Sequence, residues 1–208
     1  MWTRRYRWWH GVAFYAGVQA ASFSLKWIAG AVAKRRKPVS SGEDRAFYRA
    51  ERLPVFAPPT VAFPIAWSIN SAAAIAGGLH VLNLPRRTRG RDEFLQWQAA
   101  AWILYSSFQA AYFGLRSPIN AAAVTVLYSA ATAASLDAAI RRMRDSRAAW
   151  SLAPTVAWLA LANPLGITQA LWNRDPFWSA GPFAEPKAEW VKSMPKEEQR
   201  ELKLTPAR

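Results

Sequence analysis

Few residues in this chain could carry ligand chemistry, and the first candidates are its two histidines, His10 and His80. An imidazole nitrogen can ligate haem iron, so either residue is a candidate axial ligand. No second ligand lies at a suitable spacing from either one. A lone histidine near a helix end more often forms a hydrogen bond where the protein meets water. Iron ligation and a structural hydrogen bond both stay open, and the second is favoured.

The residue constellations of common enzymes are missing from the sequence. The chain has no cysteine, which excludes disulfides, zinc–thiolate sites, iron–sulfur clusters and thiol catalysis. It contains no HExxH, P-loop or GxGxxG motif. Carboxylates are nearly absent from its apolar stretches, which argues against an acid–base pair or a proton relay. We therefore expect no catalytic residue, no metal site and no enzyme activity.

The most informative stretch is a proline-rich run that leads into a long uncharged segment. Residues 54–67 read PVFAPPTVAFPIAW, and no charged residue follows until Arg86. A soluble protein rarely builds such a helix, because it has no polar face. In a membrane, Pro58 and Pro59 can lie at the helix start, where a missing N–H costs little.

Similar apolar blocks recur along the chain, and each is long enough to cross a hydrocarbon core of about 30 Å. Three of the connections between blocks are short, which predicts antiparallel neighbours. Alanine dominates several blocks, so we expect close helix packing through small side chains. The predicted organisation is a basic N-terminal segment at 1–8, a five-helix transmembrane bundle at 9–174 with helices at 9–33, 61–84, 94–115, 118–140 and 148–172, and a polar, aromatic tail at 175–208.

Composition indicates a membrane environment rather than nucleic acid. The net charge is +14, yet the cations flank apolar blocks and form no single stripe, so we expect anionic lipid head groups as partners and no nucleic acid. The 12 tryptophans are typical of a membrane–water interface. The acid-free start fits an uncleaved organellar address or a cytoplasmic anchor. The expected location is the mitochondrial inner membrane or another organellar or bacterial membrane.

Two charged residues lie inside predicted spans. Lys26 is expected to extend its ammonium toward the interface rather than serve a buried function. Asp137 is one helical turn from Arg141 and is expected to pair with it. The alternative for Asp137 is a functional cavity.

The tail from Asp175 onward differs in composition from the bundle. Prolines, aromatic residues and charges alternate in it, which fits an extended segment lying on another surface. Trp178, Phe183 and Trp190 are the candidate anchors for a partner.

Three separated motifs follow one another along this chain. The proline-rich run continues into Phe63, Pro64 and Trp67, residues 112–118 read YFGLRSP, and the last apolar block carries prolines and tryptophans. In this order, residues 48–174 resemble the TspO/MBR family of tryptophan-rich sensory and translocator proteins. The resemblance implies an all-α membrane protein, a TspO-like bundle of five transmembrane helices, here with an extended C-terminal tail.

The resemblance also implies a cavity between the helices for tetrapyrroles or sterol-like ligands, with basic residues at its rim that pair with carboxylates. Arg49 and Arg52 are the candidate rim residues. The family's Asn-x-x-Trp-Ser/Pro-Pro motif is replaced here around Tyr105 and Phe108, so the ligand-facing surface differs. The implied lining residues are Phe63, Trp67, Tyr105, Phe108, Tyr112, Trp158 and Asn163.

Two functions follow from these observations. The first is a divergent TspO-like membrane protein that binds a tetrapyrrole, sterol or lipid without strong catalysis. The second is an accessory subunit of a larger organellar complex, respiratory or ATP synthase, that keeps the fold and has lost the ligand site. A homo-oligomer is the further alternative for its assembly.

Overall fold

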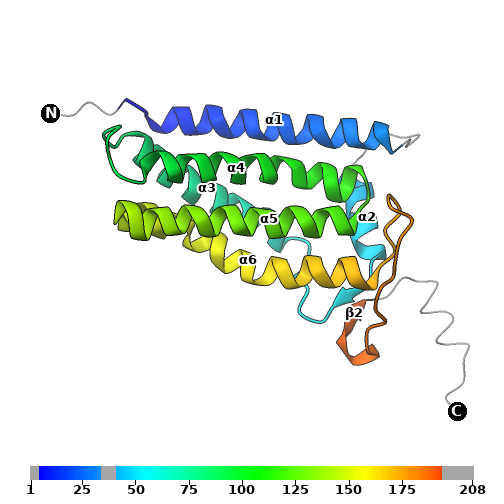
Figure 1. Ribbon diagram of the computed structural model, residues 1–208. Coiled ribbons are helices and arrows are strands. Elements are labelled where there is room, and N and C mark those ends of the chain that lie inside the picture. Colours follow the sequence, from blue (N-terminus) through cyan, green and yellow to red (C-terminus); the bar gives the residue numbers. More distant parts are fainter. Residues whose placement is uncertain (1–4, 34–40, 194–208) are drawn as a thin grey trace, which may run out of the picture.

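The computed structural model describes residues 5–33 and 41–193. Within these residues, five long helical segments lie side by side, with a short helix, α2, across one end (Figure 1). Predictions that concern 1–4, 34–40 and 194–208 lie outside the described residues. The elements are α1 (Trp8–Val32), α2 (Ser41–Ala50), β1 (Leu53–Pro54), α3 (Ala62–Leu82), α4 (Arg91–Gln109), η1 (Ala110–Gly114), α5 (Pro118–Asp137), η2 (Ala138–Met143), α6 (Ser146–Trp172), η3 (Ala188–Trp190) and β2 (Val191–Ser193).

Local sequence explains where the last two long helices begin. The Ser117 hydroxyl accepts a bond from the Asn120 amide at 3.1 Å, and Pro118 occupies the first turn of α5. The Asp145 carboxylate accepts a bond from the Ala148 amide at 3.0 Å at the start of α6. Both caps satisfy amides that a helix start leaves without a partner.

Two of the long segments end in wider π-helical turns. Helix α4 continues into η1, and α5 continues into η2. Each turn is followed by an arginine in the left-handed region, Arg116 and Arg144, both with φ of 53°. The extra turn carries the fourth helical segment to Met143, three residues beyond its predicted end at Ile140.

Small residues bring neighbouring helices close together. A Cβ added to Gly77 of α3 would lie 2.5 Å from the Ser151 Cβ of α6. A Cβ added to Gly114 of η1 would lie 2.7 Å from the Ala29 Cβ of α1. The backbones therefore approach at these points only because no side chain separates them.

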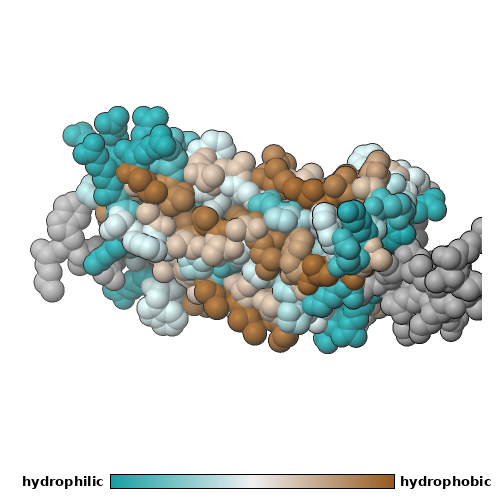
Figure 2. Space-filling model, turned by 90° about the horizontal axis from the view of Figure 1, so that it is seen from below, coloured by the Kyte–Doolittle hydropathy of each residue, from teal (hydrophilic) through white to brown (hydrophobic). Residues whose placement is uncertain are grey.

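On the face shown in Figure 2, hydrophobic side chains occupy the middle of the bundle and hydrophilic ones gather toward its two ends. Large apolar side chains such as Phe23, Ile69, Ile103 and Leu127 are exposed on four of the helices. By length and composition, two described helical segments, Ala62–Leu82 and Pro118–Met143, are apolar enough to cross a membrane.

The loop and the tail differ most from the sequence-based expectations. Helix α2 was not predicted inside the first loop. Lys26 does not extend to solvent; it is 9% exposed and forms an ion pair with Asp44 of α2. Asp137 and Arg141 form the expected pair, with 2.9 Å between Oδ1 and Nε.

The described part of the predicted tail packs on the bundle. Strand β2 pairs antiparallel with β1, and the Lys192 ammonium donates to the Ala57 carbonyl at 2.7 Å. Asp175 is fully buried. Its carboxylate accepts bonds from the Ser117 hydroxyl at 2.6 Å and from the amide of Ile119 at 3.0 Å. Residues 175–193 therefore close over the end of the bundle that carries α2.

Candidate functional site

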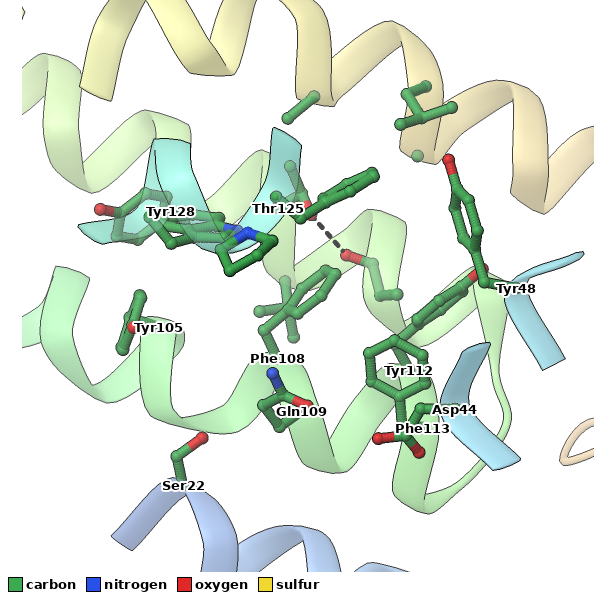
Figure 3. A pocket seen from close by; sticks show the side chains of 18 of the residues that line it. Ser22, Asp44, Tyr48, Tyr105, Phe108, Gln109, Tyr112, Phe113, Thr125 and Tyr128 are labelled. Carbon is green, nitrogen blue, oxygen red and sulfur yellow. Dashed lines mark hydrogen bonds between the residues drawn. The ribbon is translucent and has the colours of Figure 1, made fainter. Parts of the chain in front are cut away.

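A cavity of about 400 Å³ lies between the helices, toward the end of the bundle covered by α2. Its volume falls within the roughly 300–1,000 Å³ range of small-molecule sites. Side chains from α1, α2, α3, α4, η1, α5 and α6 line it. Figure 3 shows Asp44 and Tyr48 at one side of the cavity and Tyr105 and Tyr128 at the other.

Aromatic rings form a connected wall in this cavity. Trp67 is its centre, with ring centroids 5.3 Å from Tyr105, 5.9 Å from Tyr128 and 6.2 Å from Trp158. Phe63 joins Trp158 at 5.5 Å. These edge-to-face contacts hold each ring at a fixed angle in the cavity wall.

Hydrogen bonds fix two of the lining tyrosines. Gln19 donates to the Tyr105 hydroxyl at 3.1 Å, and Gln169 donates to the Tyr112 hydroxyl at 2.8 Å. The glutamines therefore join α1 to α4 and α6 to η1 on opposite sides of the cavity.

Two other lining residues hold buried polar atoms that have no partner among the described residues. These atoms are the Tyr48 hydroxyl and the Trp158 indole nitrogen. Burial raises the pKa of Tyr48 to about 12, so its hydroxyl keeps its proton at neutral pH. A buried donor without an acceptor is costly, and a ligand oxygen placed here would remove that cost.

One cation and one anion of α2 line the α2 side of the cavity. Asp44 is held by Lys26, whose ammonium also lies 5.6 Å from the Phe113 ring centroid. Arg45 is exposed and lines the cavity beside Asp44. The sequence analysis predicted a basic residue at the rim of the cavity, and Arg45 is the arginine that lines it.

Six of the seven predicted lining residues do line the cavity. They are Phe63, Trp67, Tyr105, Phe108, Tyr112 and Trp158. Asn163 does not; its amide donates to the Ser129 hydroxyl at 2.8 Å and to the Leu159 carbonyl at 2.9 Å. Asn163 therefore joins α6 to α5. Later in α6, Leu165 and Gln169 line the cavity instead.

The two predicted rim arginines lie away from the cavity lining. Arg49 is exposed at the end of α2. Arg52 bonds to the C-terminal segment: Nη1 is 2.9 Å from Glu185 and 3.3 Å from the Trp172 carbonyl. Arg45, one helical turn before Arg49 on α2, lines the cavity in its place.

The partner candidates in the tail keep exposed rings. Trp178, Phe183 and Trp190 are 57%, 61% and 55% exposed. The Trp178 indole donates to the Asn120 side chain at 3.0 Å, and the Trp190 carbonyl accepts from the Val55 amide at 3.0 Å. The Trp178 ring is therefore held on α5 by its indole nitrogen, whereas the backbones of Phe183 and Trp190 are bonded to Leu171 and Val55 and their rings remain exposed.

Neither histidine lines the cavity. His80 bonds to Asp145 at 2.7 Å, and His10 accepts a bond from the Arg7 amide at 3.0 Å. Both histidines therefore make structural hydrogen bonds, which the sequence analysis favoured over iron ligation.

Two buried carboxyl groups, those of Glu51 and Asp175, lie at the α2 end of the bundle and were not predicted from the sequence. Glu51 is 6% exposed, and its Oε2 has no partner among the described residues. Burial, together with the charge of Asp175, raises the pKa of Glu51 to about 8. No sequence signal marks it, because Glu51 and Asp175 lie far apart in the chain.

The fold and the cavity together define a class: a helical bundle with exposed apolar surface and an aromatic cavity between its helices. Comparison with known families gives the same result, since the model described as the TspO/MBR family matches residues 19–171. The chain belongs to the TspO/MBR family, which is a family of membrane proteins. A search of curated proteins found no relative that matches it.

The segment that departs from the family pattern is still part of the cavity. Tyr105, Phe108 and Gln109 occupy the altered motif, and all three line the cavity. This segment therefore contributes two aromatic rings and an amide to the lining.

Proposed function

We propose that this chain is a five-span membrane protein that binds a flat hydrophobic ligand, a tetrapyrrole in preference to a sterol or lipid, without strong catalysis. The observation that carries the proposal is the aromatic cavity with its two unpaired donors, Tyr48 and Trp158. Ring faces stack on a planar ligand, while the hydroxyl and indole N–H meet its oxygen atoms. Arg45 supplies a positive charge for a carboxylate.

The lining fits the ring of a tetrapyrrole better than its metal. Among the described residues that line the cavity there is no histidine, cysteine or methionine, and tyrosine is the one side chain there of a type that binds haem iron. We therefore expect metal-free protoporphyrin to bind, because ring stacking needs no iron ligand.

Porphyrin titration of the detergent-purified protein tests this function. Protoporphyrin IX should quench tryptophan fluorescence and shift its own absorbance in a saturable way. Replacing Tyr48 and Trp158 together by phenylalanine removes both donors and leaves an aromatic ring at each position, although the ring at 158 becomes smaller. Each lost bond weakens binding about fivefold, so the double variant should bind about 10–30 times more weakly.

Trp97→Phe is the control, because Trp97 is half-exposed on α4 and does not line the cavity. Its affinity should equal that of the unaltered protein. A flat titration of the unaltered protein, or equal losses in both variants, contradicts the proposal.

An accessory subunit of a larger complex, in the mitochondrial inner membrane or a related membrane, is the second candidate function. It is favoured by the exposed rings of Phe183 and Trp190, whose backbones are bonded to the rest of the protein, and by Trp178, whose exposed ring is held by Asn120. Rigid exposed aromatics lose little entropy on binding a partner.

Native electrophoresis of mildly solubilised membranes tests the second function. The protein should migrate in a high-mass assembly, and replacing Phe183 and Trp190 by alanine should release it. Replacing the exposed Trp27 of α1 by alanine is the control and should leave the assembly intact. Migration as a monomer or dimer in all samples contradicts the subunit role.

A further inference from the structure

A second hollow, of about 750 Å³, lies at the end of the bundle opposite α2. It forms where the starts of α1 and α6 meet the last turns of α3. None of its residues lines the aromatic cavity. The residues used below are Arg7, Trp8, Ala73, Ala76, Arg147 and Trp150.

Two exposed arginines give the hollow a positive charge. Among the described residues, neither Arg7 nor Arg147 has an acidic partner within ion-pair distance. Asp145, which begins α6, is bonded to His80 and to the Ala148 amide. The nearby carboxylate is therefore engaged, and the two guanidinium groups remain able to bind an anion.

Small side chains of α3 form an apolar part of the hollow. Ala73 and Ala76 of α3 present only methyl groups, and Gly77 presents none. Trp8 and Trp150 are each 75% exposed beside them. An indole ring on the surface of a membrane helix prefers the level of the lipid head groups. Below that level, the small side chains leave room for a hydrocarbon chain.

The wall formed by the start of the chain is fixed in place. The Tyr6 amide donates to the Asn83 side chain at 2.9 Å, and the Asn83 amide group donates back to the Tyr6 carbonyl at 2.8 Å. This reciprocal pair holds Arg7 beside the last turn of α3. The hollow is therefore shaped before any ligand arrives.

We infer that this hollow is a binding site for an anionic phospholipid. The phosphate lies on Arg7 and Arg147, the glycerol backbone lies between Trp8 and Trp150, and one acyl chain lies along Ala73 and Ala76. Charge complementarity selects an anionic head group, and the apolar floor selects a lipid over a soluble phosphate. This site is independent of the aromatic cavity and of any ligand bound there.

Native mass spectrometry in a neutral detergent tests the inference with phosphatidylglycerol and phosphatidylcholine as probes. The unaltered protein should retain one phosphatidylglycerol in preference to phosphatidylcholine. Replacing Arg7 and Arg147 by glutamine should weaken phosphatidylglycerol binding about thirtyfold, since each basic residue near a membrane surface contributes about 1 kcal/mol. Phosphatidylcholine retention should change little.

Arg86→Gln with Arg87→Gln is the matched control. These arginines are exposed at the same end of the bundle and lie outside the hollow, so the control removes the same charge. Its lipid binding should equal that of the unaltered protein. Equal loss in both double variants would show a general charge effect and overturn the inference.

Ala76→Phe tests the apolar part without changing any charge. Ala76 is exposed, so the larger ring fills the hollow and leaves the helix contacts intact. This variant should lose phosphatidylglycerol while its unfolding temperature in detergent stays unchanged. Unaltered lipid retention, or displacement of the lipid by equimolar glycerol phosphate, overturns the inference.

Discussion

At the scale of single residues, Glu51 is the clearest departure from ordinary chemistry. The unfolded chain ionises this carboxyl near its usual pKa of 4.5, whereas burial and the charge of Asp175 raise its folded-state pKa to about 8. Below pH 4.5 both states keep the proton. Between pH 4.5 and 8 only the unfolded state loses it, so stability must fall as the pH rises through this window.

The expected result is that Glu51→Gln removes part of the pH dependence of stability. The unaltered protein should lose stability from pH 5 to pH 8, on the order of a few kcal/mol, because the unfolded state alone gains the charge. Unfolding temperatures in detergent across this range measure the effect.

The variant's curve should be flatter, and the difference between the two curves isolates Glu51 from the histidines. Parallel curves for the two proteins would mean that Glu51 ionises normally in the folded state.

Individual side chains show which parts of the site could be predicted. Trp67 and Phe63 follow the proline-rich run, and the resemblance of this run to the TspO/MBR pattern was enough to predict that they line the cavity. Lys26 and Arg52 were misplaced because their partners, Asp44 and Glu185, come from segments whose positions no periodicity reveals. Long-range pairing decides the orientation of a long charged side chain.

At the scale of elements, the contact between α3 and α6 depends on one missing side chain. Gly77 leaves no room for a methyl group, which would lie 1.9 Å from the Ser151 hydroxyl oxygen. Gly78, its neighbour on the same helix, has open space around the same position.

Replacing Gly77 by alanine should therefore destabilise the protein by about 1–3 kcal/mol, because α3 and α6 must move apart. Gly78→Ala has the same chemistry without the clash, and its better helix propensity should leave stability unchanged or raise it slightly. Thermal unfolding of both variants in the same detergent compares them. Equal stabilities would show that α3 and α6 are not held at this distance.

The elements were predictable where apolar runs are long. The five helical segments cover the predicted blocks, and α3 differs from its block by one residue at the start and two at the end. Helix α2 was missed because its ten residues are polar on average and lie between basic segments. Its position comes from a buried ion pair to α1, which the sequence pattern does not contain.

At the scale of the whole molecule, the proposed five-span arrangement would place the two ends of the bundle on opposite sides of a membrane. The turn between α3 and α4 lies at one end, and the C-terminal segment lies at the other with α2 (Figure 1). Because the chain has no cysteine, a single introduced thiol reports its own side.

Arg87→Cys and Ala188→Cys are suitable variants for this labelling experiment, since both side chains are exposed. In sealed vesicles, a membrane-impermeant maleimide should label one variant and not the other. Detergent should then make both reactive. Labelling of both variants in intact vesicles would contradict an odd number of spans between them.

The pairing of β2 with β1 also constrains how the protein is made. Leu53 and Pro54 acquire their partners only when residues 191–193 have left the ribosome. Until then, the segment next to α2 and the aromatic cavity lacks its neighbouring strand. Translation that stalls after the last long helix would therefore leave β1 without its partner strand at the α2 end of the bundle.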